Sequence, residues 1–539
     1  MSKDFLPRTV GLASIAIGLS LFPRVAQART EISPYIEVQQ VLDAQLSSPS
    51  DVLTYSTIAA GVDASVTGHR VEATVSYRYE YRIPWDKKKM DSGDVHSGIA
   101  RGEYQLLPGK LNIEGGAMAT RTRTDIRGAA PLILTGSKDN ISQVYGFYGG
   151  PTLSTHVGPL QVGASYQLGY VKVEDQNNVL LPAGSQRLDV FDHSLVQNAQ
   201  GSVGMESGLL PFGWTVSGGW QREDASQLDQ LYNGKYARLD VTVPVTPHIA
   251  LTAGVGYEDI KISERAVVRD GAGNPVRDAN GRFVTDKSSP RLAFYDTDGL
   301  IYDAGIIWRP SPRTTVQARV GKRYGETAYT GSLDYQINKN SGLQVGVYNG
   351  IQSFGRQLTT DLAALPTSFQ VTRNPFGGDV NNCVFGTAPG SGGCMEDAFQ
   401  SISTSNFRAR GVNALFSAKR GPWNMGVGIG YAERRYIAPI DGSFFSVDGV
   451  TDKSVTGEFT LTRQLTRSSG ITGAVYAAWY NPGIAQSQDV FAYGGTGTYF
   501  HTFGERLSAQ ASLGIYAYDQ QQSDETVSGA AQLGMRYTF

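Results

Sequence analysis

The chain contains 539 residues, among them 64 Gly, 28 Tyr and two Cys, and its 47 Lys and Arg nearly balance 49 Asp and Glu. This composition excludes a helical membrane protein, because no stretch beyond residue 28 approaches the 18 apolar residues that a membrane-spanning helix needs. It also excludes a nucleic-acid partner, which would require a basic patch. No long Pro- or Ser-rich linker divides the chain, so we expect a single domain after residue 28.

The first 28 residues have the three parts of a secretory signal peptide. Lys3 and Arg8 give a positive start, residues 10–22 are apolar, and Ala26-Gln27-Ala28 has the small-x-small form of a cleavage site. The apolar run is too short to cross a bilayer as a helix, although a membrane anchor is the alternative. We expect cleavage after Ala28 and a mature chain of residues 29–539.

Many later segments alternate between apolar and polar residues, as a strand with two different faces does. In residues 71–82, for example, Tyr77, Tyr79 and Tyr81 alternate with charged neighbours. Charges in the middle of long strands do not suit a β-sandwich, the alternative all-β fold. They suit a transmembrane barrel that presents apolar residues to lipid and polar residues to a wet lumen.

The connections between these segments alternate in length. Short turns occur at 67–70, 107–110, 157–159, 244–247, 309–313, 338–341, 420–422, 466–469 and 504–505, and longer polar links occur at 84–93, 125–139, 175–189, 263–291, 352–405 and 438–452. Outer-membrane barrels keep short turns on the periplasmic side and long loops outside. We therefore predict an all-β fold, a transmembrane antiparallel up-and-down β-barrel of about 22 strands (20 is the alternative), with both termini periplasmic.

A ring of about 22 strands is too wide for side chains to fill, and such barrels need a plug. The alternation begins at Ile32, immediately after the predicted cleavage site, so we expect no separate plug domain. The bore is then open or closed by an inward-folded loop. The link at 352–405 is the longest candidate for that loop, with an external position as the alternative.

Charged residues on the polar faces are predicted to line the lumen: Glu72, Arg78, Glu80, Arg82, Arg101, Glu103, Glu114, Arg238, Asp240, Asp303, Arg319, Arg323, Glu458 and Arg536. Their signs are mixed, which predicts weak ion selectivity, since selectivity needs rings of one sign. Gln, Thr, Ser and Tyr between them offer exchangeable hydrogen bonds to hydroxyl-rich solutes. Pairing between strands is the alternative role for each charge.

Three sets of residues could serve other chemistry. Cys383 and Cys394 form an even pair in an exported chain, which predicts a disulfide. The oxygens of Asp379, Asn381 and Asp397 match no defined calcium loop, so we expect no metal, and no cofactor motif occurs. His96 lies two residues from Asp94, and this acid–histidine pair gives a membrane-embedded hydrolase as a third functional alternative; we expect no catalytic residues.

The last thirteen residues, 527–539, alternate to the final position and end on Phe539. With Tyr537, this aromatic terminus resembles the last strand of bacterial outer-membrane proteins, the segment that the barrel-assembly machinery reads. Together with an export signal, it predicts location in the outer membrane.

Four segments carry a resemblance to a known family: P-Y-I-E-V-Q-Q-V (34–41), R-V-E-A-T-V-S-Y-R-Y-E-Y-R (70–82), D-V-H-S-G (94–98) and the terminal G-M-R-Y-T-F. They resemble the β-barrel porin 2 group, which includes outer-membrane proteins of exopolysaccharide and exosortase gene clusters. The resemblance would cover the mature chain. It implies a role in polysaccharide export or envelope biogenesis, with outer-membrane lipids, the assembly machinery and polysaccharide-export components as partners.

These observations lead to two main functional hypotheses. The first is an outer-membrane channel for exopolysaccharide or other polar solutes. The second is a non-conducting scaffold or surface-loop adhesin in envelope biogenesis.

Overall fold

The structure is a computed structural model that describes residues 29–47, 50–87, 90, 93–127, 140–174, 188–440, 446–484, 487–520 and 525–539. The predicted signal peptide and its cleavage point after Ala28 lie outside the described residues.

A sheet of 22 strands forms the wall of the molecule. Its strands are β1 (Arg29–Gln45), β2 (Asp51–Thr67), β3 (Val71–Pro84), β4 (Gly93–Leu107), β5 (Leu111–Arg123), β6 (Ile141–Val157), β7 (Leu160–Glu174), β8 (His193–Met205), β9 (Gly213–Ala225), β10 (Leu231–Thr246), β11 (Ile249–Glu264), β12 (Leu292–Ser311), β13 (Thr314–Arg323), β14 (Glu326–Asn338), β15 (Ser341–Gln352), β19 (Asn406–Arg420), β20 (Trp423–Ile437), β21 (Thr451–Gln464), β22 (Ser469–Asn481), β23 (Val490–Phe503), β24 (Leu507–Gln520) and β25 (Thr526–Thr538). A short 3-10 helix, η1 (Gln227–Asp229), precedes β10.

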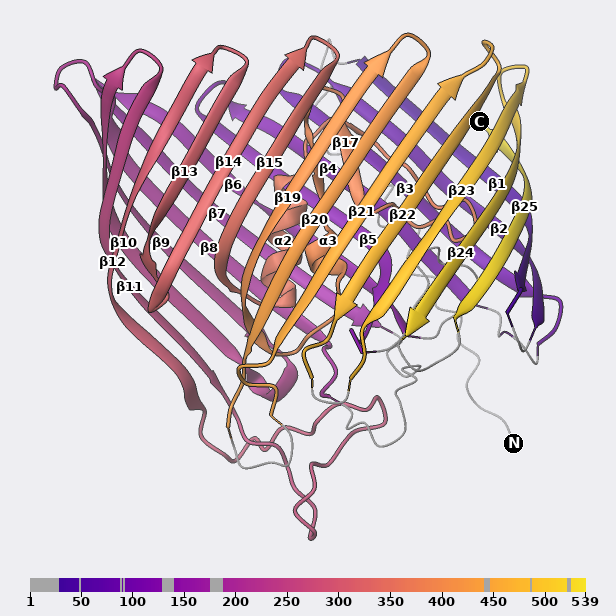
Figure 1. Ribbon diagram of the computed structural model, residues 1–539, viewed down its shortest axis with the longest axis horizontal. Helices are drawn as coiled ribbons and strands as arrows, with labels where there is room; N and C mark the ends of the chain where they lie inside the picture. The colour runs from indigo at the N-terminus through magenta and orange to yellow at the C-terminus, as the bar shows by residue number, and fades with distance from the viewer. Residues whose placement is uncertain are drawn as a thin grey trace.

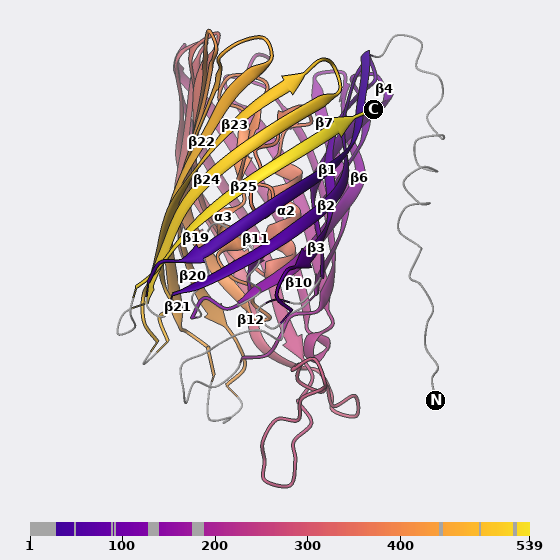
Figure 2. The same ribbon diagram turned by 90° about the vertical axis from the view of Figure 1, so that its right-hand side faces the viewer.

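The sheet closes on itself. Consecutive strands pair antiparallel around the ring, and β1 pairs with β25 from Tyr35↔Thr538 to Gln45↔Ser528 (Figures 1 and 2). The period-two pattern explains the two surfaces: Ile58 is 55% exposed on the outside, whereas Arg78 is 2% exposed on the inside. Because β1 and β25 pair with each other, the sheet of the wall has no free edge.

The two rims of the barrel differ. Tight turns join the strands at one rim, called here the short-turn rim, and longer connections join them at the other, the long-link rim (Figure 1). Arg29 lies opposite Thr67, and the Phe539 N–H donates to the Pro34 carbonyl, so both ends of the described chain lie at the short-turn rim. One tight turn, Tyr324-Gly325 with φ of 56° and 74°, lies at the long-link rim between β13 and β14.

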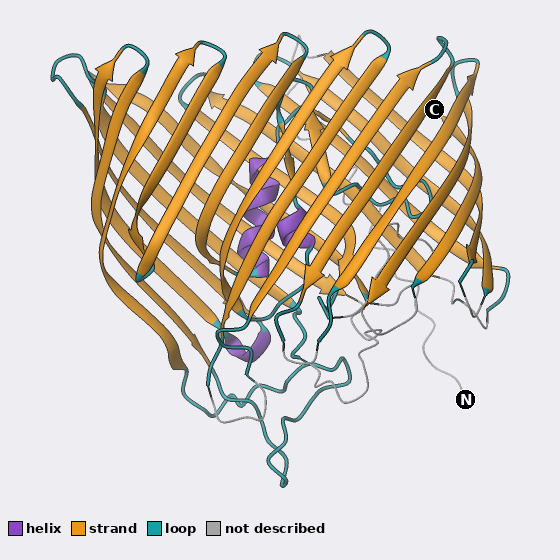
Figure 3. Ribbon diagram, in the orientation of Figure 1, coloured by secondary structure: helices purple, strands orange, loops and turns teal. Residues whose placement is uncertain are grey.

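The predicted fold class, an all-β barrel with no separate plug domain, is wrong in its account of the lumen. Residues 353–405, called here the lumenal unit, fold inside the barrel (Figure 3). They form α2 (Phe354–Ala364), α3 (Glu396–Phe399) and a three-stranded sheet of β16 (Phe369–Gln370), β17 (Cys383–Gly386) and β18 (Gly392–Cys394). A helix-containing unit therefore occupies the position that an open bore would leave empty.

The lumenal unit has its own apolar core, and the barrel wall completes it. Phe354, Leu358 and Leu362 recur every four residues, which places them on one face of α2, and they are at most 1% exposed. They pack against wall residues of β4 to β7 and the β7–β8 link: Ile99, Met118, Val144, Tyr148, Val171, Val173 and Phe191. None of the helices in the described part of the chain is long and apolar enough to cross a lipid bilayer.

Candidate functional site in the barrel lumen

Helix α2 is held to the wall at its first turn. The Ser353 hydroxyl accepts from the Arg356 N–H and donates to the carboxylate of Glu223 on β9. The Arg356 guanidinium lies 3.2 Å from Glu223 Oε2, donates to Asn406 Oδ1 at 2.8 Å, and stacks 3.5 Å from the Tyr232 ring centroid. A helix cap and a buried ion pair thus share one carboxylate.

The end of α2 is capped from the wall by a predicted lumen residue. Arg101 donates from Nε to the Leu365 carbonyl at 3.1 Å and from Nη2 to the Ala363 carbonyl at 2.5 Å. These carbonyls have no intrahelical partner at a helix C-terminus, where a cation is favourable. The same guanidinium lies 3.3 Å from Glu114 on β5.

Cys383 and Cys394 are joined by a disulfide that links β17 to β18. The bridge lies against Gly428 of β20, where an added Cβ would come within 2.2 Å of Cys383 Sγ. The ring of Phe385 fills a similar place over Gly426. The unit therefore approaches β20 closely at two positions where that strand has no side chain.

Replacing both cysteines with serine should destabilise the lumenal unit by about 3 kcal/mol, since the bridge closes a short loop in the unfolded chain. Limited proteolysis should show faster cleavage within residues 353–405. Pairing of the wall strands does not involve this disulfide, so the heat-modifiable migration of the barrel should be unchanged. Equal proteolysis of both proteins would contradict the expectation.

Residues 373–381, called here the latch, join the unit to β4, β5 and β21 of the wall through polar contacts. Arg121 of β5 donates to Asp379 Oδ2 at 2.5 Å, and Arg373 donates from Nη1 to Ser97 Oγ at 2.7 Å. Asn381 donates to Glu458 Oε1 of β21 at 2.9 Å. The α2 side is thus mainly apolar, whereas the latch side is mainly polar.

Two apolar side chains of the latch are buried: Val380 belongs to the apolar core around α2, and Phe376 packs against the wall elsewhere. Phe376 is fully buried in a cluster with Val41, Tyr55 and Tyr516 on three wall strands. It lies over Gly514, where an added Cβ would come within 2.6 Å of its ring. The Tyr55 hydroxyl also donates to the Phe376 carbonyl at 3.3 Å.

Four predicted lumen residues form one network beneath the latch. Arg78 Nη2 lies 2.8 Å from Glu80 and 3.3 Å from Glu37, and Arg82 Nε lies 2.7 Å from Glu80. Arg536 on β25 reaches Glu37 at 2.7 Å. Glu37, which sequence reasoning did not select, joins the barrel seam to β3.

Two other predicted residues, Glu72 and Glu103, lie nearer the short-turn rim. Glu72 is directly opposite Glu103, and Glu103 is directly opposite Glu114, on β3, β4 and β5. Like charges in directly opposed positions repel. This row places three carboxylates side by side on neighbouring strands.

The wall of β10 to β13 carries a second network. Arg238 reaches Asp240 at 2.6 Å and Asp303 at 2.8 Å, and Arg319 reaches Asp240 at 2.6 Å and Asp303 at 3.1 Å. Arg238 crosses β11 at Gly254, where an added Cβ would come within 2.0 Å of its guanidinium. Four predicted residues thus lie flat against the wall with no net charge.

The remaining predicted cation on this side, Arg323, pairs with Glu258 at 3.1 Å and lies 5.3 Å from the centroid of the Tyr236 ring.

The lumenal unit does not cover the whole wall. Inward-facing Gln317 and Thr330 on β13 and β14 are exposed, whereas inward-facing Ser512 and Thr57 on β24 and β2 are 2% and 1% exposed. On this exposed side a tight turn, rather than a long link, joins β13 to β14, so the long-link rim is lower there. The inner face of the wall is therefore more open to water at β13 and β14 than at β24 and β2.

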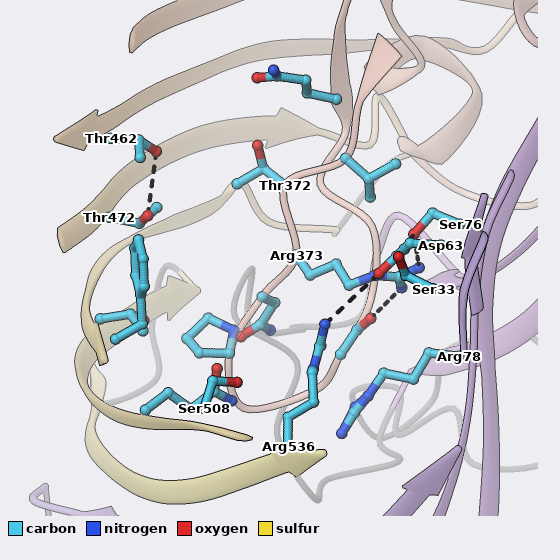
Figure 4. Close-up of a pocket in the computed structure, with 18 of the residues that line it drawn as sticks. Ser33, Asp63, Ser76, Arg78, Thr372, Arg373, Thr462, Thr472, Ser508 and Arg536 are labelled. Atoms are coloured by element: carbon cyan, nitrogen blue, oxygen red, sulfur yellow. Dashed lines mark hydrogen bonds and ion pairs between the residues drawn. The ribbon is translucent and has the colours of Figure 1, made fainter. Parts of the chain in front are cut away.

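A cavity of about 770 Å³, called here the vestibule, lies between the latch and the short-turn rim (Figure 4). Arg78, Arg373 and Arg536 approach it from one side, with Asp63 between them. The facing side is rich in hydroxyl groups from β21 to β24: Thr460, Thr462, Thr472, Thr498, Thr502 and Ser508. This lining offers hydrogen bonds of both polarities without a strong net charge.

Two carboxyl groups lie in the lumenal unit itself. Burial raises the pKa of Asp397 to about 6, against hydrogen bonding by Tyr348 and the charge of Arg434. Burial and then the neighbouring Asp397 raise the pKa of Asp361 well above its usual value. Both groups bind protons more tightly in the docked unit than in an unfolded chain.

These shifts predict a pH dependence of docking. Protonation of these two carboxyl groups stabilises the docked unit. This stabilisation is complete below about pH 3.8 and is lost as the pH rises through about 6. We expect openings in a planar bilayer to be rarer at pH 5 than at pH 8, and Asp397→Asn to keep the low-pH behaviour at pH 8. Equal opening at both pH values, or rarer opening at pH 8, would contradict this expectation.

The residues considered for hydrolysis and for calcium binding do not form a site in the structure. His96 Nε2 is 3.4 Å from Asp94, and Tyr77 hydroxyl contacts His96 Nδ1 at 2.7 Å. Among described residues, no serine, threonine or cysteine side chain hydrogen-bonds to the His96 ring. Asp379 and Asn381 bind different partners, and the described residues contain no group of three metal-ligating side chains.

The predicted assembly signal lies on the last strand. Tyr537 is 37% exposed and Phe539 is 63% exposed, with their ring centroids 5.3 Å apart. Tyr537 therefore lies on the outer face of β25 and Phe539 at the short-turn rim.

Several site residues were missed from the sequence: Glu37, Arg121, Glu223, Arg356, Arg373 and Phe376. Arg121, Arg356 and Arg373 act through contacts 50 to 276 residues away. The alternation of apolar and polar residues along a strand does not predict contacts between residues so far apart in the chain. The signal for α2 was present, because Ser353 precedes apolar residues at four-residue spacing.

Comparison with known proteins leaves the family open. No family model matches the chain, and no curated protein is similar to it. The structure is similar to the ferric-catecholate import receptor Fiu of E. coli K12 in its open form, with 10% identity, a TM-score of 0.46, and coverage of 94% of this chain and 81% of that one.

Two further neighbours have similar values. The siderophore receptor PiuA of Acinetobacter baumannii has 10% identity, a TM-score of 0.44, and coverage of 94% of this chain and 82% of that chain. The copper transporter OprC has 10% identity, a TM-score of 0.40, and coverage of 94% and 81%. These proteins are named as receptors or transporters.

Proposed function

We propose that this protein is an outer-membrane channel for polar solutes whose width is controlled by the lumenal unit. The observation that carries the proposal is the asymmetric attachment of that unit. Its α2 side shares an apolar core with β4 to β7, whereas the latch adds only Val380 to that core and is otherwise held by exchangeable polar contacts and the ring of Phe376. Release of the latch alone would widen the bore, because the α2 side would stay in place.

The lining supports a polar solute of low net charge. The network of Arg238, Asp240, Asp303 and Arg319 is neutral, and the vestibule is rich in hydroxyl groups. Hydroxyl-rich chains exchange hydrogen bonds with such walls at little cost. We include exopolysaccharide among the proposed solutes, supported by the resemblance to the β-barrel porin 2 group, with outer-membrane lipids and the barrel-assembly machinery as proposed partners and both termini periplasmic.

Planar-bilayer recording tests the channel directly. The purified protein should show a small, weakly ion-selective conductance along the β10 to β14 side, with rarer transitions to a larger state when the latch releases. Asymmetric KCl should give a reversal potential near zero. A protein that stays silent both intact and without residues 354–404 would contradict the proposal.

A second candidate function rests on the link between β11 and β12. Val276 donates to the Val268 carbonyl at 2.8 Å, Val284 to Val276 at 3.0 Å, and Val268 to Val284 at 2.8 Å, which closes a ring of three hydrogen bonds at the base of two eight-residue lobes. This link projects from the long-link rim (Figure 2). Such a preorganised projection favours a binding scaffold, for which we expect no conductance and specific co-purification of another envelope protein.

A further inference from the structure

An apolar groove of about 880 Å³ lies on the outer surface of the barrel, over β21 to β25. Two rows of opposed residues form it. Leu461, Gly473, Gly497 and Leu513 follow one another across four strands, and Ile471, Tyr499, Ala511 and Leu533 form the row nearer the short-turn rim. Glycine and alanine provide the floor, and the leucines stand at its sides.

The floor is unfilled. A Cβ added at Gly497 would meet nothing within 4 Å, while Leu513 and Leu533 are 70% and 68% exposed. Most ligand pockets occupy roughly 300–1,000 Å³, so the groove has the size of a ligand site. It faces the hydrocarbon of the proposed membrane, where the available occupants are lipid chains or other membrane proteins.

A cation stands at the short-turn end of the groove. Arg463 lies directly opposite Ile471, and its guanidinium is 4.7 Å from the centroid of the Trp423 ring. No carboxylate of a described residue pairs with Arg463. Tryptophan is enriched at the depth of lipid headgroups, so the pair marks the height at which lipid phosphates lie.

We propose that the groove binds a phospholipid of the leaflet at the short-turn rim, with its phosphate on Arg463 and an acyl chain over Gly473 and Gly497. Guanidinium groups bind phosphate through charge-assisted hydrogen bonds. A second copy of the chain fits less well. The groove contains no acidic residue, so a symmetric dimer would bring two Arg463 side chains together without a partner.

Native mass spectrometry of the full chain tests the site, with phosphatidylglycerol and diacylglycerol of the same acyl chains as probes. We expect Arg463→Gln to weaken phosphatidylglycerol binding about tenfold, the loss of one charge-assisted contact, and to leave diacylglycerol binding unchanged. Gly497→Leu fills the floor and should weaken binding of both lipids.

Matched controls are available elsewhere on the barrel. Gly201 on the outer face of β8 is also open, with nothing within 4 Å of an added Cβ, so Gly201→Leu should leave lipid binding unchanged. Lys339→Gln removes an exposed cation from the same rim. Heat-modifiable migration verifies that each variant folds.

Two results would overturn the lipid site. One is equal lipid binding by the wild-type protein, Arg463→Gln and Gly497→Leu. The other is a wild-type dimer that Gly497→Leu converts to monomers. The inference rests on the proposed membrane location but not on transport, since a silent protein in the bilayer recording would still bind the lipid.

Discussion

Deleting residues 354–404 and joining Ser353 to Ser405 with a short Gly-Ser linker should raise the single-channel conductance several-fold. The barrel should still assemble, because β15 and β19 are neighbours and Gln352 lies directly opposite Phe407. The linker therefore replaces the unit with a simple hairpin turn. The larger conductance is expected because a wall of 22 strands leaves an aqueous bore when nothing fills it.

A matched deletion separates this effect from general loss of loops. Residues 268–284 belong to the link between β11 and β12 at the same rim, and Val267 and Thr285 at its base form a β-bridge. Removing 268–284 should leave the conductance unchanged, since this link projects away from the lumen. Equal conductance of the intact protein and the 354–404 deletion would show that the unit does not obstruct the path.

The second large effect is expected from Phe376→Ala. Removing a fully buried phenylalanine costs about 3–5 kcal/mol, and the loss falls on the latch rather than on the barrel, because backbone pairing of the wall strands does not involve Phe376. We expect the larger conductance state to become dominant. Single-channel recording gives the ratio of the two states, and hence the change in latch free energy.

Phe354→Ala is the control for this substitution. It removes an equally buried ring from the α2 side, where the unit and the wall share their apolar core. It should destabilise the unit without selectively favouring the latch-open state. An unchanged state ratio in Phe376→Ala would contradict the role of the latch.

The strand pattern and the closing connection were accessible from the sequence. Alternation in residues 71–82 placed Arg78, Glu80 and Arg82 on one face, and the length of the 352–405 link singled it out as the segment to fold inward. The disulfide partners were named from their number alone. These features depend on residues close together in the chain, so they can be predicted from composition and periodicity.

The fold-class prediction considered only a separate plug domain ahead of the barrel, and it did not include residues 353–405 as a folded unit, inserted within the strand order, that fills part of the lumen. The latch was missed for a different reason. Asp379 and Arg373 become partners of Arg121 and Ser97 only after the barrel closes, and no periodic pattern marks Phe376 as a buried residue. The inward-facing Gly254 and Gly514 make room for Arg238 and Phe376. The sequence pattern did not predict this role for either glycine.

The central claim is that the lumenal unit covers one side of the bore and leaves the other open. Single cysteines at Gln317 on β13 and Ser512 on β24, tested with a membrane-impermeant maleimide, measure this directly. The account predicts rapid labelling at position 317 and protection at position 512 that Phe376→Ala removes. Equal labelling of the two positions in the otherwise wild-type protein would contradict it.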